Sequence, residues 1–288
     1  MTGTGYTSTL AEAAGERVDL IDTGRRDGPP LLITSGLGGA WFDWDPSVAL
    51  LRDAHRVLIY DRPGLGLSPA GQAPPSLRRD VRIMAELAED AGPPVTVLAH
   101  SMGAFAAEAL ARARPKLVDG MVLVDPSYEH APRGRPRVAA VLHPLTRALA
   151  AVLDLTRLAR LAGPAGRRVV LGFASDRDDT VPKGLVRDVY GRGTVLGTIV
   201  AEEFAYREMA TDLAALRERR PFPPIPLVVL TALGDVRDTG GGREWSRGHR
   251  LLAAMSPRGR QVELPGARHM LQLDRPDAIA DAVAEVLG

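Results

Sequence analysis

A single serine, Ser101, lies where a buried strand is expected to end and a helix to begin. The strand is the apolar run at residues 95–99, and the helix is expected over residues 103–113. A sharp strand-to-helix turn lifts a serine hydroxyl clear of the sheet, and it requires small neighbours, here Ala99 and Gly103. The N-terminus of the helix favours a developing negative charge. Ser101 is therefore a candidate nucleophile, although a simple N-cap serine would show the same local pattern.

Two more side chains of the right types, Asp235 and His269, follow the expected strands at residues 227–230 and 261–264. Carboxyl ends of parallel strands meet at one edge of the sheet, where α/β proteins place their sites. An imidazole there can take the proton of a serine hydroxyl, and a carboxylate can hold the imidazole in one tautomer. We therefore expect Ser101, Asp235 and His269 to form a catalytic triad, with Asp235 as the orienting acid.

Other candidates for the acid are present. Asp125 directly follows the apolar strand at residues 120–124; its other interpretation is a turn residue before Pro126. Asp238 is a lesser rival because it is close to Asp235. His100 precedes the nucleophile, and we expect it to point to the opposite side of the turn and to serve packing.

The composition excludes several classes of protein. The 288 residues are 45% hydrophobic and 25% charged, as in soluble globular proteins. The formal charge of +1 gives no reason to expect nucleic acid or a membrane as partner. The absence of cysteine excludes disulfides, thiolate metal sites and a cysteine nucleophile. No apolar run approaches the roughly 20 residues of a membrane helix, and no signal pattern opens the chain. We expect a cytoplasmic protein with a small-molecule substrate and no metal or organic cofactor; the oligomeric state stays open.

The elements that position these residues alternate along the chain. Apolar strands are expected at residues 17–21, 31–34, 56–60, 95–99 and 120–124, with helices at 77–91 and 103–113. This alternation predicts a mostly parallel sheet with helices on both faces. Residues 127–222 instead carry leucines at helical spacing, divided by prolines, and strands return at 227–230 and 261–264. We predict one α/β core domain from residues 1–126 and 223–288, with a helical insertion at residues 127–222.

Two segments resemble a known family. Tyr60-Asp-Arg-Pro-Gly-Leu-Gly-Leu-Ser68 resembles the D-x-P-G-x-G-x-S turn of the α/β-hydrolase fold, and residues 265–276 are similar to its G-x-x-H-x6-P ending. The resemblance covers nearly the whole chain outside residues 127–222. It implies an eight-stranded, mostly parallel sheet flanked by helices, with an inserted all-helical cap. It also implies an oxyanion hole made by the backbone N–H groups of Leu37 and Met102.

The chain departs from the family pattern at two places. Ala99 replaces the first glycine of the serine motif, and Ser35-Gly36 replaces the usual His-Gly before the oxyanion hole. Ala99 is small enough for the turn. Ser35 leaves two alternatives open. Either the loop is held in another way, or the hydroxyl of Thr34 or Ser35 binds the substrate, as in family members that are lyases.

The resemblance and the triad together imply a serine hydrolase. It would cleave a carboxylic ester, thioester or lactone of a small, largely apolar molecule through an acyl-enzyme. Apolar helix faces and aromatic side chains of the cap would line the substrate pocket: Phe173, Tyr190, Phe204 and Tyr206. Two alternatives are a lyase or cyclase that uses the triad for acid–base chemistry, and a ligand receptor without activity.

Overall fold

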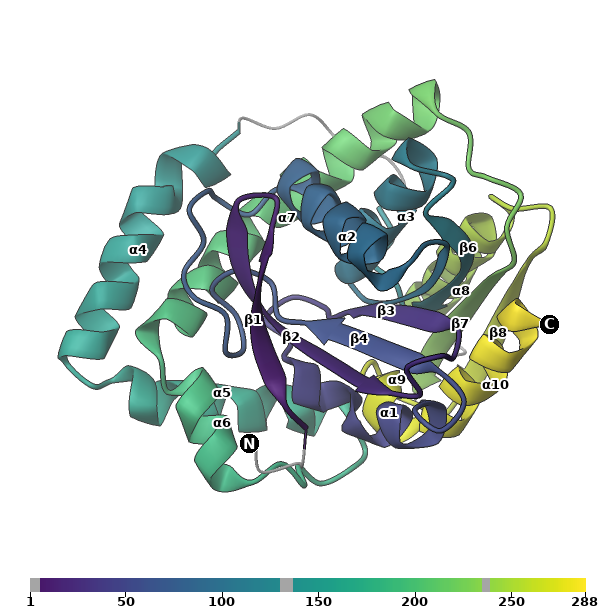
Figure 1. Ribbon diagram of the computed structural model, residues 1–288. Coiled ribbons are helices and arrows are strands. Elements are labelled where there is room, and N and C mark those ends of the chain that lie inside the picture. The colour runs from purple at the N-terminus through teal and green to yellow at the C-terminus, as the bar shows by residue number, and fades with distance from the viewer. Residues whose placement is uncertain (1–5, 130–136, 235–238) are drawn as a thin grey trace.

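The computed structural model describes residues 6–129, 137–234 and 239–288. Eight strands form one sheet in the order β1-β2-β4-β3-β5-β6-β7-β8 (Figure 1). The pairs β1·β2 and β2·β4 are antiparallel, and all other neighbours are parallel. The predicted α/β fold is thus confirmed. The strands are β1 (Ser8–Ala13), β2 (Glu16–Gly24), β3 (Pro30–Thr34), β4 (Arg56–Tyr60), β5 (Val95–His100), β6 (Val118–Val124), β7 (Leu227–Gly234) and β8 (Gly259–Pro265).

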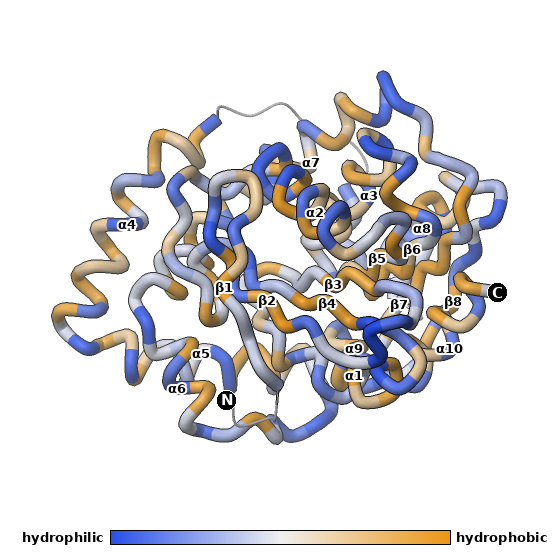
Figure 2. The backbone as a smooth tube through the Cα atoms, viewed as in Figure 1, coloured by the Kyte–Doolittle hydropathy of each residue, from blue (hydrophilic) through white to orange (hydrophobic). Residues whose placement is uncertain are grey.

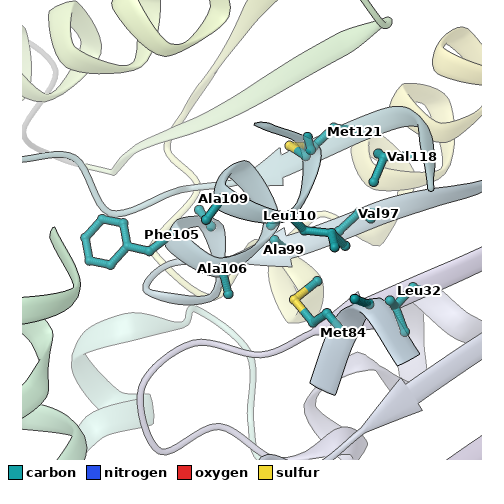
Figure 3. Close-up of a cluster of buried hydrophobic side chains, with 14 of the residues drawn as sticks. Leu32, Met84, Val97, Ala99, Phe105, Ala106, Ala109, Leu110, Val118 and Met121 are labelled. Carbon is teal, nitrogen blue, oxygen red and sulfur yellow. The ribbon is translucent and has the colours of Figure 1, made fainter. Parts of the chain in front are cut away.

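The central strands are apolar on both faces because helices cover both sides of the sheet. All six residues of β5 are buried, as in other parallel sheets enclosed by helices. Helices α2 (Leu77–Ala91), α3 (Gly103–Ala113) and α8 (Gly240–Ala253) cover one face. The short helix η1 (Trp41–Trp44), α1 (Asp45–Leu51), α9 (Leu271–Asp274) and α10 (Pro276–Leu287) cover the other. Figure 3 shows Leu32 and Val97 of the sheet facing Met84 of α2 and Leu110 of α3.

The described residues between β6 and β7 form four helices: α4 (Ala139–Leu155), α5 (Ala159–Ala174), α6 (Lys183–Tyr190) and α7 (Gly193–Arg219). They fall within the proposed cap, residues 127–222. Glycines allow α4 and α7 to pack closely, since a Cβ on Gly197 would lie 2.7 Å from the Thr146 carbonyl oxygen. In the described residues no single helix is long and apolar enough to cross a membrane. Helices α4 and α5 reach the required length and apolarity only when taken together, and the chain bends by 110° between them.

Candidate active site

Ser101 lies at the turn between β5 and α3, as predicted. Its φ of +50° is in the left-handed region, which non-glycine residues rarely adopt and which is typical of functional turns. The small neighbour Gly103 is required, because a Cβ there would lie 2.7 Å from the carbonyl oxygen of Ser35. His269 follows β8, and its Nε2 lies 3.1 Å from the Ser101 Oγ. The structure therefore brings the predicted nucleophile and base into hydrogen-bond contact.

Among the described residues, the acid in contact with His269 is Asp125. Asp125 Oδ2 lies 2.6 Å from His269 Nδ1. Asp125 Oδ1 accepts hydrogen bonds from the Ala232 N–H at 2.9 Å and the Trp245 indole N–H at 3.0 Å. Because a carboxylate only accepts, Nδ1 of His269 carries the proton and Nε2 is free to accept from the serine hydroxyl.

This contact makes Asp125 the candidate for the orienting acid. The single N–H at Nδ1 of the imidazole already has its carboxylate, whereas the expected acid Asp235 and its rival Asp238 lie outside the described residues. Strand order explains how Asp125 reaches the base. Asp125 follows β6, which is the direct neighbour of the strand β5 that ends at the turn of Ser101. Chain order alone does not distinguish the end of β6 from that of β7.

His100 was predicted to point to the opposite side of the turn, but it lies at the site. Its Nε2–H donates to the carbonyl oxygen of His269 at 3.0 Å, and the two rings lie 4.6 Å apart. Burial, followed by the proximity of His269, holds the pKa of His100 well below its usual value. His100 therefore stays neutral, and it holds the backbone of the candidate base His269. No spacing in the sequence distinguishes this role from simple packing.

The oxyanion-hole candidates lie on two segments that meet at the nucleophile. A Cβ on Gly36 would lie 2.9 Å from the Cβ of Ser101, so the loop before Leu37 contacts the turn that carries the serine. Met102 follows that serine at the start of α3. Within the described residues, neither the Leu37 N–H nor the Met102 N–H donates a hydrogen bond. Both donors are thus available to an oxyanion.

The oxyanion loop is held by side chains of the core. Arg62, in the turn after β4, donates to the carbonyl oxygens of Ser35 at 2.5 Å and Gly36 at 2.7 Å. The Ser35 hydroxyl accepts from the Trp44 indole N–H at 3.1 Å. Of the two alternatives for Ser35, these contacts favour a role in holding the loop.

The same loop is also held by the cap. Glu202 of α7 is fully buried, forms a bidentate ion pair with Arg62 at 2.7 and 2.9 Å, and accepts the N–H of Gly38 at 3.1 Å. Burial alone would lower the pKa of Arg62, but the negative charge of Glu202 raises it above its usual value. Tyr190 of α6 donates its hydroxyl to the Gly38 carbonyl at 3.0 Å. Both polar backbone groups of Gly38 are therefore bonded to cap residues.

A cavity of about 370 Å³ lies between the triad and the cap. Its lining is mostly apolar and comes from α5, α7 and the loop after β8. The main apolar side chains are Val170, Leu171, Ala174, Leu196, Ile199 and Met270. Of the four aromatic residues expected here, Tyr190 alone lines the cavity. Phe173 is 82% exposed, Phe204 is partly exposed, and Tyr206 packs on Phe105.

The charged side chain of Arg167 at the cavity edge is already paired. Arg167 of α5 donates to Asp43 at 2.8 Å and to Asp179 at 2.9 Å. Its charge is thus compensated by two carboxylates. In the parts of the chain that the structure describes, no three His, Asp or Glu side chains gather into a group that could hold a metal ion.

Comparison with known proteins identifies the family. Residues 31–282 match the model of the alpha/beta hydrolase family. The chain belongs to this family. Alpha/beta hydrolases with solved structures share its fold, among them the carboxylesterase CesB of Bacillus subtilis. That structure has a TM-score of 0.65 and 13% identity, and the match covers 98% of this chain and 91% of that one.

Several curated relatives of this alpha/beta hydrolase carry hydrolase or lipase names. A protein of Variovorax paradoxus, provisionally named carbamate hydrolase RutD, is 38% identical over 107 residues. That match covers 35% of this chain and only 40% of the relative. The (lyso)-N-acylphosphatidylethanolamine lipase of Bos taurus is 25% identical over 91% of this chain and 80% of its own length. These similarities support a hydrolytic role.

Proposed function

We propose that this alpha/beta hydrolase cleaves a carboxylic ester, thioester or lactone of a small, largely apolar molecule through an acyl-enzyme. One observation carries the proposal: Ser101, His269 and Asp125 form a continuous chain of hydrogen bonds beside an apolar cavity. A triad that only supported the fold would not need to line a cavity between the sheet and the cap.

The mechanism follows from the direction of these hydrogen bonds. His269 Nε2 takes the proton of Ser101 as Oγ attacks the substrate carbonyl, and Asp125 stabilises the imidazolium that forms. The N–H groups of Leu37 and Met102 stabilise the oxyanion; one such donor typically contributes about 10²–10³-fold in rate. The leaving alcohol or thiol receives the proton from His269. Water then attacks the acyl-enzyme in the same way and restores the serine.

The lining of the cavity favours a substrate with an apolar acyl or alcohol group. Its aliphatic lining offers little hydrogen bonding to a polar substrate, and pockets of this kind select by shape and apolar contact. A carbamate, the substrate class in the name of the Variovorax relative, presents a carbonyl to the same machinery. It therefore belongs in the substrate panel.

The lyase alternative rested on a hydroxyl of Thr34 or Ser35 that binds the substrate. Thr34 is buried and its hydroxyl is bonded to that of Tyr60, which argues against Thr34. The Ser35 hydroxyl accepts from Trp44 and keeps its own proton to donate. The hydrolase and lipase names of the relatives favour hydrolysis over this alternative.

Turnover of nitrophenyl esters from acetate to octanoate, with a thioester, a lactone and a carbamate alongside, tests the proposal. We expect turnover of one acyl class, saturable in substrate and lost in Ser101→Ala and His269→Ala. Turnover that survives in both variants would contradict it.

A further inference from the structure

Helix α4 turns its apolar face to the solvent. Only Ala139 and Thr146 of its 17 residues are buried. The exposed large side chains recur every three or four residues and so share one face of the helix: Val141, Leu145, Leu149, Val152 and Leu155. Leu155 is 86% exposed. Figure 2 shows that hydrophobic (orange) segments recur along α4, which lies at the left edge of the view. A surface helix normally shows the opposite arrangement.

The exposed apolar series continues on α5 and reaches the catalytic cavity. Leu161, Val169 and Phe173 of α5 are exposed. Val170 is 60% exposed and also lines the cavity beside the triad. Contiguous exposed apolar side chains often mark interaction sites in soluble proteins.

An arginine-rich pocket adjoins the turn between the two helices. Its volume is about 480 Å³, and four arginines and two aspartates line it: Arg157, Arg160, Arg187, Arg192, Asp154 and Asp188. Arg192 donates to backbone carbonyls, and Asp154 accepts the N–H of Gly193. Among the described residues, Arg157, Arg160 and Arg187 form no ion pair with a carboxylate. Three guanidinium groups are thus free to bind phosphate, a ligand that suits their geometry.

A second copy of the chain fits this surface poorly. In a two-fold contact the same patch meets itself, so the unpaired arginines would approach one another. An anionic phospholipid surface instead offers phosphate for the arginines and an acyl boundary for the apolar face. Interfacial helices have this combination of apolar and basic residues.

We propose that α4 and α5 bind an anionic phospholipid surface, with Arg157, Arg160 and Arg187 on headgroup phosphates and the apolar face of α4 at the acyl boundary. The helices lie on the surface, since their 110° bend gives no single span. This proposal departs from the expectation of no membrane partner. That expectation rested on the summed charge of +1, which conceals a local excess of arginine.

Vesicle sedimentation with the full chain tests the apolar face without any turnover, so its outcome is independent of ester hydrolysis. We expect binding to vesicles of equal parts phosphatidylglycerol and phosphatidylcholine. The pair Leu145→Glu and Leu155→Glu should weaken it by about tenfold or more. The control pair, Leu50→Glu and Leu251→Glu, changes exposed leucines on α1 and α8 and should leave it unchanged. Circular dichroism checks that each variant is folded.

Charge reversal tests the arginine pocket. Each arginine near an anionic surface contributes about fivefold in binding, so Arg160→Glu with Arg187→Glu should weaken binding by more than about tenfold. Arg78→Glu with Arg82→Glu on α2 is the matched control. The protein should bind only weakly to vesicles of pure phosphatidylcholine. The proposal is overturned by equal binding to both vesicles, by no binding at low salt, or by a dimer that the leucine variants dissociate.

Discussion

Asp125 Oδ2 lies 2.6 Å from Nδ1 of His269, whose other ring nitrogen faces Ser101. The carboxylate is itself fixed, because its second oxygen accepts from a backbone N–H of β7 and from an indole of α8. Asp125 has a φ of +40°, so the backbone is turned at the end of β6 where the carboxylate meets the base. This relationship makes Asp125 the orienting acid of the proposed mechanism.

Asp125→Asn should lower kcat by about 10⁴-fold, because an amide at this position favours the wrong imidazole tautomer. Steady-state kinetics with the best ester substrate measures the effect. Asp235→Asn is the matched comparison, and it should keep most of the activity. The opposite ranking of the two variants would return the role to Asp235.

Glu202→Gln should lower kcat by about tenfold to a hundredfold, since the oxyanion loop loses the charge that holds Arg62 and Gly38. It should also destabilise the fold by about 3–5 kcal/mol, because a buried arginine loses its partner. Kinetics and chemical denaturation on the same samples measure both effects.

Glu108→Gln separates the two effects of Glu202→Gln. Glu108 of α3 is buried and forms ion pairs with Arg112 and Arg217, and none of its hydrogen bonds goes to the oxyanion loop. We expect a similar loss of stability with kcat nearly unchanged. If both variants lose kcat equally, Glu202 has only a structural role.

Gly166→Leu should shift the substrate preference toward shorter acyl chains. Gly166 lines the cavity, and a Cβ there meets no atom within 4 Å, so the added side chain fills space rather than displacing neighbours. A methylene in an apolar pocket contributes about 1–3 kcal/mol, so kcat/KM for the longest accepted ester should fall at least tenfold. Gly172→Leu on the same helix also enters open space but outside the cavity, and it should leave the preference unchanged.

Asp45→Asn should raise the Tm more at pH 8 than at pH 5. Burial, together with the nearby charge of Asp43, raises the pKa of Asp45 from 3.8 to about 7. The folded state therefore binds more protons than the unfolded state between these values, and the free energy of unfolding falls as the pH rises through them. Asparagine does not titrate, so the variant loses this pH dependence of the free energy of unfolding. The exposed Asp53→Asn is the control, and an equal Tm change at both pH values would contradict the prediction.

The sequence predicts the interior of the sheet better than its edge. β4 has the predicted bounds and β5 ends one residue later, since continuous apolar runs mark strands buried on both faces. β1 was missed because it is an edge strand with one buried residue, so its hydrophobic pattern is weak. Its pairing with β2 depends on tertiary contacts that a local pattern does not contain.

The site residues divide in the same way, into those that local sequence predicts and those that depend on tertiary contacts. Ser101 and His269 stand in local motifs and could be predicted, because the turn and the loop impose residue types at fixed spacing. Asp125 and Glu202 depend on which strands and helices are neighbours in space. Glu202 is 140 residues from Arg62, and no spacing connects them. Physical contact, rather than chain order, decides these two roles.

Fluorophosphonate labelling followed by peptide mapping tests the central claim most directly. The account predicts one phosphonyl adduct, on the peptide that contains Ser101, and loss of both adduct and ester turnover in Ser101→Ala. An adduct on another residue, or turnover that persists in Ser101→Ala, would contradict it.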